Sequence, residues 1–444
     1  MKLLFSILLT VVILFAVGAK AAPIIRDTEL ETSIRTLANP IFKAAGLKSE
    51  DVRIYIVNNN EINAYVTGGK NIFIHTGLLS LAKDPNMLVG VIAHETGHIY
   101  GGHLLKGEEE AKNSVVKATF GYMLGLAAAA AGSPQAGAAI ASGTQQVVTR
   151  QVLKNSRNNE NAADHSALNF LDKSGVSSKG ILDMMEVLYG KEVTMYGEIN
   201  PYTQTHPLSR ERIDHVRAHY NGSPIAAKLL NPDVTAIYTR AIIKLDAFLQ
   251  APDKTLKKFP VSDTSVNARY ARAIAYYRVP KLAQALTEID ALIKEFPSDP
   301  YFIELKAQIL FENGKVADSV AAYQRAKDLL PGSSLFKIQL ATAQVATEDE
   351  ALLKNAVSNL EQAIRVEKLN SFAWHQLGIA YGRMGKLDMS NLALAEEAMI
   401  IGDKDEAKRF IKIARQSATP GSPTDLRLKD MESNINDGKK SKKD

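Results

Sequence analysis

The second half of the chain contains an internal repeat with a period of 34 residues. Phe296-Pro297 and Leu330-Pro331 stand 34 residues apart, and aligning the chain on these prolines superposes Ala273 on Ala307, Ala285 on Ser319 and Leu292 on Ala326. Such a period is typical of two-helix units, in which small residues recur where the helices cross and the prolines end the second helix. Residues 266–420 are therefore predicted to form an all-α solenoid.

The later units identify the kind of repeat. The next unit matches with three extra residues near Thr347–Glu350, and the one after it reads Trp374, Leu377, Gly378, Tyr381 and Gly385. Gly402 with Ala407, Ile411 and Ala414 resembles a last, partial unit. The pattern resembles the tetratricopeptide signature. The resemblance implies a concave surface that holds peptide segments or partner proteins rather than a catalytic site.

The N-terminus has the three parts of a secretory signal peptide. Lys2 is followed by an apolar run over Leu3–Val17 and by the small-residue pattern Ala19-Lys20-Ala21. Residues 1–21 are therefore predicted to be cleaved, and an uncleaved membrane anchor is the alternative. The chain has no cysteine, so it is neither a lipoprotein nor disulfide-bonded. Export without disulfides favours a bacterial periplasm.

The net charge gives no indication of nucleic-acid binding. The formal charge is +5, and loss of Lys2 and Lys20 with the signal lowers it to +3. Gly438–Asp444 carry four lysines and one aspartate, so the folded body is neutral. A nucleic-acid partner would require a basic face on a folded domain. We expect residues 421–444 to be a disordered basic tail, with weak attraction to anionic lipid headgroups as an alternative role.

A second, mixed domain precedes the repeats, because 444 residues exceed what one core usually supports. Val52–Val57 and Asn71–His75 are β-branched and aromatic runs, and Gly68-Gly69 indicates a hairpin. We expect residues 22–225 to form this domain, with helices and a small β-sheet, and residues 226–265 to be connecting helices. The chain is thus predicted to be mainly α.

Residues 120–143 are almost free of charge and rich in alanine and glycine, and Ser133-Pro134 divides them into two arms. Each arm is too short to cross a bilayer. Two interpretations remain open. The segment is either a helical hairpin packed against the domain, or a lid or element that makes peripheral membrane contact.

The segment VIAHETGHIYGGH, residues 91–103, lies on one predicted helix. Asp84-Pro85 is a helix start and Gly101-Gly102 a helix stop. His94 and His98 are four residues apart and project from the same face, so both can bind one Zn²⁺ at about 2.1 Å. Glu95 lies beside them, where it can hydrogen-bond a zinc-bound water.

Three other histidines are less informative. His215 and His219 are also four apart, but no glutamate follows the first, and their neighbours Arg212, Asp214 and Arg217 indicate a solvated helix face. His103 lies beyond the helix stop, and we expect it either to lie on the surface or to contact a metal ligand from behind, without a part in the chemistry.

A catalytic zinc requires a third protein ligand, and the segment RNNENAADHSAL supplies a candidate. Glu160 and Asp164 are four residues apart on a slim, alanine-rich helix. If Glu160 binds the metal, Asp164 can accept the N–H of a ligand histidine and fix its tautomer.

These residues together resemble the gluzincin metallopeptidases of the CAAX prenyl endopeptidase and HtpX heat-shock protease type. The likeness covers about residues 35–220 and includes NAYVTGGKNIFIHTGLL and THPLSRERI. It implies a zincin-like fold with one Zn²⁺ per chain, His94, His98 and Glu160 as ligands, and Glu95 as general base. His206 would either stabilise the oxyanion or occupy the open position of the zinc at rest.

The signal peptide and the repeats resemble the soluble, periplasmic branch of this family. Apart from the signal, no run reaches about 18 strongly apolar residues. The resemblance implies an endopeptidase for misfolded or stalled periplasmic and outer-membrane proteins, whose repeats dock these substrates or the barrel-assembly machinery. Asn71–His75 is the edge strand on which we expect a substrate to pair. The alternative is a non-proteolytic chaperone or scaffold with a structural or plugged zinc site, against which the intact Glu95 argues.

Overall fold

A computed structural model describes residues 24–103, 155–194, 201–347 and 349–440 of the chain. These residues belong to two compact units. Unit 1 extends to Ile242, and unit 2 comprises Asp27–Leu30 together with the chain from Ile243 onward. The signal peptide predicted over residues 1–21 and the uncharged segment 120–143 lie outside the described residues, so both remain predictions.

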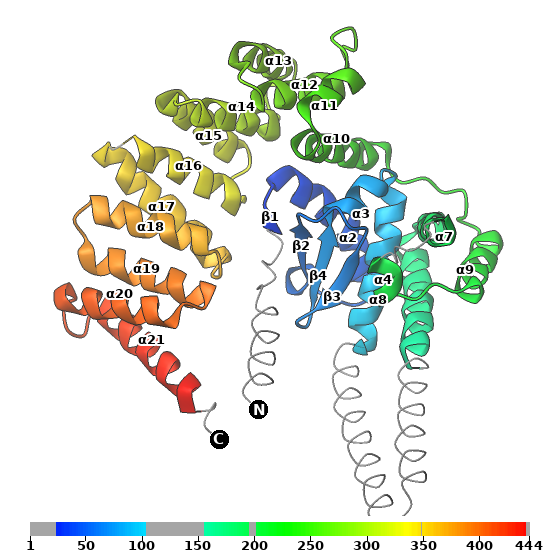
Figure 1. The fold of residues 1–444 in the computed structure, drawn as a ribbon, viewed down its shortest axis with the longest axis horizontal. Helices are drawn as coiled ribbons and strands as arrows, with labels where there is room; N and C mark the ends of the chain where they lie inside the picture. The colour runs from blue at the N-terminus through cyan, green and yellow to red at the C-terminus, as the bar shows by residue number, and fades with distance from the viewer. Residues whose placement is uncertain (1–23, 104–154, 195–200, 348, 441–444) are drawn as a thin grey trace, which may run out of the picture. The chain divides into compact units, whose positions relative to one another are not determined.

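Unit 1 contains a four-stranded sheet in the order β1-β2-β4-β3 (Figure 1). The strands are β1 (Ile24–Ile25), β2 (Arg53–Val57), β3 (Ala64–Thr67) and β4 (Asn71–His75). The predicted hairpin is confirmed, because β3 and β4 are antiparallel and are joined at Gly68 and Gly69, with φ of 58° and 93°. Positive φ is common in such short hairpin loops, and glycine adopts it without strain.

The prediction that Asn71–His75 is an edge strand was wrong. β4 lies between β3 and β2, with which it pairs in parallel. Among the described strands, β3 therefore forms one edge of the sheet and β1 the other. Local patterns predict that a strand exists, but the parallel β2–β4 pair is a non-local contact that they do not encode.

Side chains alternate between the two faces of the sheet. Ile72 and Ile74 are fully buried on one face. On the other face Phe73 stacks between Tyr55 and Tyr65, with ring centroids 4.9 and 5.3 Å apart. This period of two is expected for a strand with one core face.

The helices of unit 1 are α2 (Thr28–Ala44), α3 (Thr76–Leu81), α4 (Pro85–Gly101), the unlabelled helix 155–174, α7 (Lys179–Thr194), α8 (Pro201–Thr205) and α9 (Arg210–Gly222), with a short 3₁₀ turn at Ser49–Asp51.

Helix α4 begins and ends where the sequence predicts. The Asp84 side chain accepts a hydrogen bond from the Asn86 backbone N–H, and Gly102 ends the helix with a left-handed φ of 62°. Two of its glycines permit close helix packing. A Cβ on Gly97 would lie 2.6 Å from the carbonyl oxygen of Ala163, and one on Gly90 would lie 2.5 Å from the backbone nitrogen of Ile181. Helix α4 therefore packs in close backbone contact with helix 155–174 and with α7.

Unit 2 is a stack of antiparallel helix pairs (Figure 1), which confirms the predicted all-α solenoid. The aligned residues Ala273, Ala307, Ala285 and Ser319 are all completely buried. The three extra residues near Thr347–Glu350 lie in the turn between α16 and α17. The helices that reach into this unit or lie within it are α10 (Pro232–Leu249), α11 (Pro252–Lys258), α12 (Val266–Tyr277), α13 (Leu282–Glu295), α14 (Pro300–Glu312), α15 (Val316–Leu329), α16 (Ser334–Ala346), α17 (Glu350–Val366), α18 (Ser371–Arg383), α19 (Leu387–Ile401), α20 (Lys404–Ser417) and α21 (Pro423–Lys440).

The expectation of a disordered tail over residues 421–444 was wrong for most of its length. Residues Pro423–Lys440 form helix α21, and its Leu428, Met431 and Ile435 are buried against α19 and α20. These residues follow the helical spacing of three and four, which the high charge of the segment conceals. The last helix therefore covers the apolar end of the array, as terminal repeats require.

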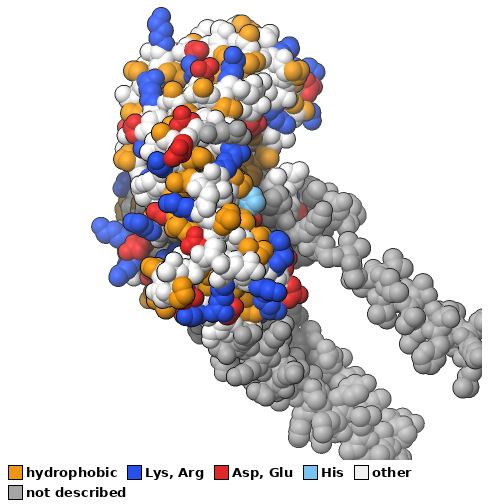
Figure 2. Space-filling model, turned by 90° about the vertical axis from the view of Figure 1, so that its left-hand side faces the viewer, with side chains coloured by type: hydrophobic (Ala, Val, Ile, Leu, Met, Phe, Trp, Pro, Cys, Tyr) orange, Lys and Arg blue, Asp and Glu red, His pale blue; other side chains and the backbone are white. Residues whose placement is uncertain are grey.

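The surface of the molecule carries mixed charge. On the face seen in Figure 2, basic and acidic side chains are interspersed with hydrophobic ones. Among the described helices, none combines the length and apolar character needed to span a membrane.

Candidate metal centre

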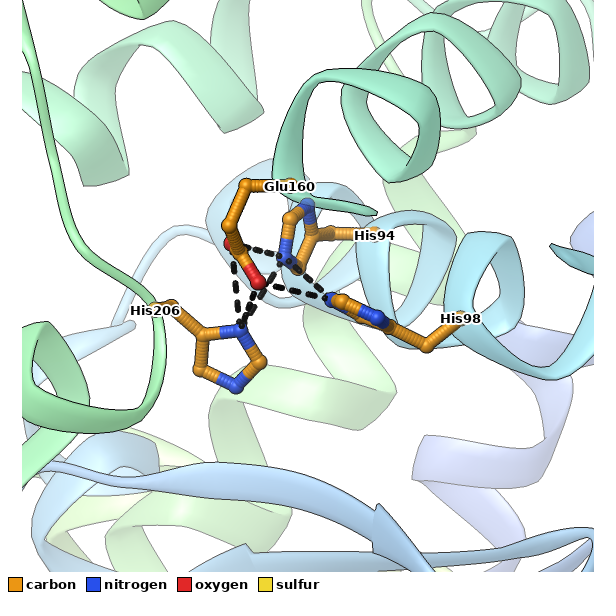
Figure 3. A group of neighbouring side chains, drawn as sticks. All are labelled: His94, His98, Glu160 and His206. Atoms are coloured by element: carbon orange, nitrogen blue, oxygen red, sulfur yellow. Dashed lines mark hydrogen bonds and ion pairs between the residues drawn. The ribbon is translucent and has the colours of Figure 1, made fainter. Parts of the chain in front are cut away.

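Four side chains from three segments of unit 1 converge on one point (Figure 3). His94 and His98 come from α4, Glu160 from helix 155–174, and His206 from the connection between α8 and α9. Each offers one ligand atom, and these atoms lie within 4.8 Å of one another. The structure thus brings together the three ligands expected from the sequence and the histidine whose role was left open.

The spacing of these atoms fits a small four-coordinate metal ion. His94 Nε2 lies 3.1 Å from His98 Nε2 and 3.3 Å from His206 Nδ1. The Glu160 carboxylate lies 3.3 Å from each of these three histidine nitrogens. Ligand atoms at the corners of a tetrahedron, each about 2.1 Å from a zinc ion, would lie roughly 3.4 Å apart. These distances between the ligand atoms therefore match the edge lengths of such a tetrahedron.

Glu95 lies beside the four residues but does not belong to the group. Its side chain is fully buried, and neither carboxylate oxygen has a hydrogen-bond partner among the described residues. Its Oε1 lies 3.5 Å from His206 Nε2. Buried carboxylate oxygens are normally hydrogen-bonded, so this environment suits a group that interacts with a water molecule or a substrate.

Asp164 makes the contact expected of it. Its Oδ1 lies 2.8 Å from His94 Nδ1, which directs His94 Nε2 toward the other ligand atoms. Burial works against a charge on His94, but the hydrogen bonds to Asp164 and Glu160 prevail and raise its pKa to about 10. Burial also works against a charge on Glu160, yet its three histidine neighbours hold the pKa of this carboxyl well below its usual range. In the metal-free centre these contacts therefore favour a proton on His94 and a negative charge on Glu160.

Comparison with known proteins agrees with this geometry. Residues 25–220 match peptidase family M48, and residues 270–334 match a tetratricopeptide repeat. Residues 25–220 form an M48 peptidase domain. This M48 domain contains the whole metal centre, and the chain is a metalloprotease with a tetratricopeptide array.

Two relatives are similar over most of this chain, and a third is similar over a shorter part of it. The "Beta-barrel assembly-enhancing protease" of Yersinia pestis is 25% identical over 413 residues, which cover 90% of this chain and 82% of the relative. The Escherichia coli K12 protein of the same name is 24% identical over 406 residues, with the same coverage. The "Metalloprotease YcaL" of Escherichia coli K12 is 28% identical over 185 residues, which cover 40% of this chain and 66% of that protein.

His103 is more closely connected to the M48 metal centre than the sequence suggested. It is buried, and its Nδ1 lies 3.1 Å from Nδ1 of His98. Its ring lies against the backbone of Gly101, where a Cβ would be 2.2 Å from His103 Nε2. Of the two expectations for His103, a place on the surface was wrong, whereas a place behind a candidate ligand histidine is what the structure shows. The glycine pair that ends α4 was the signal, because it lets the chain turn back over the helix.

Arg212 was also misjudged, since the structure places it inside the M48 domain rather than on a solvated face. It is 5% exposed, and its Nε and Nη2 donate to the two oxygens of Asp164 at 2.6 and 2.9 Å. Its Nη1 lies 2.9 Å from Glu160 Oε2. Arg212 precedes the buried Val216 by four residues and so lies on the apolar face of α9, whereas Asp214 and His215 are exposed. That spacing was the signal in the sequence.

His215 and His219, the second pair of histidines four residues apart, make contacts outside the metal centre. His219 Nε2 lies 2.9 Å from Asp172 Oδ2, and its Nδ1 lies 3.2 Å from the Ser178 hydroxyl. Ser178 is almost fully buried ahead of α7, so these three side chains tie helix ends together. His215 is exposed and faces His165 across 6.4 Å between ring centroids.

Proposed function

We propose that the protein is a zinc-dependent endopeptidase of the periplasm that cleaves misfolded or stalled outer-membrane proteins. The observation that carries the proposal is the group of His94, His98, Glu160 and His206, with Glu95 beside it, whose carboxylate accepts no hydrogen bond from the described residues. The names of the relatives, which refer to β-barrel assembly, support the substrate class. The predicted signal peptide supports the location.

The ligands of the zinc are His94, His98 and Glu160. Asp164 holds the first histidine and His103 the second through their Nδ1 atoms, so both rings keep Nε2 directed at the site. When bound, zinc supplies Lewis acidity that lowers the pKa of a water molecule toward about 7 and polarises a peptide carbonyl.

Glu95 is the general base. Its carboxylate is completely buried next to the ligand group, and no hydrogen bond from the described residues competes for its oxygens. It can therefore accept a proton from the attacking water and pass it to the leaving amine.

Strand β3 is the surface on which the substrate lies. Ala64 begins this edge strand, and its carbonyl oxygen lies 3.3 Å from His206 Nε2, at the metal centre. An extended segment that pairs with a free strand edge is recognised mainly through its backbone. Unfolded or misassembled chains offer such segments, whereas folded barrels do not.

His206 occupies the fourth position at rest. Its Nδ1 lies 3.3 Å from His94 Nε2 and from both Glu160 oxygens, which supports a role as a plug. For cleavage this side chain must withdraw so that a water molecule and a carbonyl can enter. The resting protease is then largely inactive, and the repeats are the surface that docks substrates or the barrel-assembly machinery before cleavage.

Two substitutions test the proposed function. Glu95→Gln should keep bound zinc and abolish cleavage of an unfolded protein, because the amide cannot accept the proton. Cleavage by this variant at the wild-type rate would exclude Glu95 as the base. His206→Ala should increase cleavage at unchanged zinc content, whereas a decrease would identify His206 as a transition-state donor.

For docking, a purified wild-type chain should retain outer-membrane precursors in a pull-down. Precursor binding that is unchanged after charge reversal across the repeat surface would contradict the proposed role of the repeats.

A further inference from the structure

The segment that carries His206 is held by one side chain. It lies between α8 and α9, and Arg212 in the first turn of α9 reaches back to it. The Arg212 Nη1 donates to the carbonyl oxygen of Pro207 at 2.7 Å, directly beside His206. The same nitrogen lies 2.9 Å from Glu160.

The guanidinium therefore joins both sides of the metal centre. Its Nε and Nη2 hold Asp164, which in turn contacts His94. Its Nη1 holds the backbone next to His206 on the opposite side. The position of His206 is thus linked to the helix that carries Glu160 and Asp164 by a buried, charge-assisted bridge.

A second contact fixes the same segment by apolar packing. Leu208 lines a small cavity beside His94, together with side chains of α4 and α7 and with Tyr202 and Arg212. Leu208 and the Pro207 carbonyl are neighbours in the chain, so the segment has one apolar and one polar anchor.

We propose that Arg212 is the positioning residue that holds His206 in the fourth position, with Leu208 as its apolar partner. This inference rests on the proposed function, in which His206 is a plug. Withdrawal of His206 then requires the Arg212–Pro207 hydrogen bond to break, and a substrate opens the site by displacing this segment.

The geometry explains why an arginine is required. Four N–H directions of the guanidinium serve Asp164, Glu160 and Pro207 at once. A lysine at this position would keep the positive charge between the carboxylates, but its single nitrogen cannot reach all three acceptors. Arg212→Lys should therefore release the segment while the buried carboxylates keep a cation.

The test measures access to the fourth position rather than cleavage. The protein is loaded with Co²⁺, and acetohydroxamate is titrated while the visible absorption of the ion is followed, because the absorption changes with coordination number. His206→Ala should bind the hydroxamate about tenfold more tightly than the wild type, as expected for a position that is open one tenth of the time. An unchanged affinity in His206→Ala would refute the plug itself and with it the proposed resting state.

A double-mutant cycle then separates positioning from general damage. In the wild-type background, Arg212→Lys should raise hydroxamate affinity by about fivefold. In the His206→Ala background it should have no effect, because no plug remains to be positioned. An equal effect in both backgrounds, or none in the wild type, would overturn the proposal while leaving the plug intact.

Two further variants complete the experiment. Arg217→Lys changes a partly exposed arginine on the same helix, which pairs with Asp214 and Glu186, and should leave hydroxamate affinity unchanged. If the Arg212→Lys variant does not bind Co²⁺, Leu208→Ala takes its place in the double-mutant cycle. This substitution loosens the segment that carries His206 and leaves every charged contact in place. It should raise the affinity only when His206 is present, and an unchanged affinity would overturn the proposal.

Discussion

At the scale of single residues, hydrogen bonds to Nδ1 of His94 and His98 determine which nitrogen each ring turns toward the metal centre. His98 contacts His103 through Nδ1, and His94 contacts Asp164 through Nδ1. The two interactions differ in strength, because a carboxylate is a charged acceptor and an imidazole is a neutral one. The weaker of the two depends on His103, five residues beyond His98.

We predict that His103→Ala lowers zinc affinity by about 10- to 100-fold, the usual effect of losing a hydrogen bond behind a metal ligand. His103→Gln should recover part of the loss, because an amide can accept the N–H of His98. Competition with a chelator of known affinity measures both variants. The control is His215→Ala, which removes an exposed histidine of α9. Equal affinities for His103→Ala and this control would contradict the prediction.

The proton on His94 makes metal binding dependent on pH. In the metal-free protein the pKa of His94 is raised to about 10, so the ring is protonated at pH 7, whereas a metal ligand must be neutral. Zinc uptake should therefore release about one proton, and affinity should rise about tenfold per pH unit between roughly pH 6 and 8. Calorimetric titrations in buffers of different ionisation enthalpy measure the number of protons released when zinc binds. Asp164→Asn should reduce the number of protons released. If the wild type released no proton, the assignment of a proton to His94 in the metal-free protein would be refuted.

At the scale of secondary-structure elements, glycines set how closely the helices of the metal centre approach. Gly97 faces the backbone of Ala163 on helix 155–174, only three residues from Glu160. The distance between α4 and that helix decides whether Glu160 reaches His94 and His98. The metal centre thus depends on a position that carries no chemistry.

We predict that Gly97→Ala destabilises the fold by about 1–3 kcal/mol through overpacking and lowers zinc occupancy. Gly190→Ala is the matched control, because it adds the same methyl group inside helix α7 where no atom lies within 4 Å. The control should be neutral or more stable by about 0.4–1 kcal/mol. Chemical unfolding and elemental analysis measure both effects, and equal zinc occupancy in the two variants would contradict the prediction.

The residues that the sequence predicts well are those whose relations are local. His94, Glu95 and His98 lie within one helical turn, and Asp164 follows Glu160 by one turn, so spacing alone places each pair on a common face. The position of β4 inside the sheet, the fold of His103 over Gly101 and the reach of Arg212 to Pro207 depend on the tertiary structure. The spacing patterns on which we relied do not encode such contacts, and the charge of Arg212 concealed its burial.

At the scale of the whole molecule, each unit has a buried ionic group of its own. In unit 2 the ammonium of Lys244 lies 2.7 Å from Asp27, 3.6 Å from Glu29 and 3.5 Å from Glu304. Burial works against this charge, but Asp27 and the other acids prevail and raise the pKa of Lys244 well above its usual value. Removing one member of such a buried ionic group is strongly destabilising, because the remaining charges stay buried without their partner.

We predict that Lys244→Met lowers the free energy of unfolding of unit 2 by about 3–5 kcal/mol, because it leaves buried carboxylates without their cation. Lys354→Met removes an exposed lysine that pairs with Glu350, and should change stability by less than about 0.5 kcal/mol. Urea unfolding, followed by circular dichroism, compares the two. Equal midpoints for the two variants would show that the buried group adds no stability.

The four residues of the metal centre come from positions as far apart as His94 and His206, a separation of 112 residues. Closing so long a stretch of chain is slow and costs entropy, so a complete set of ligands exists only after most of the M48 domain has folded. A newly synthesised chain is consequently not expected to become proteolytic before the M48 domain has reached its native state. Maturation of the protease is thereby timed by folding itself.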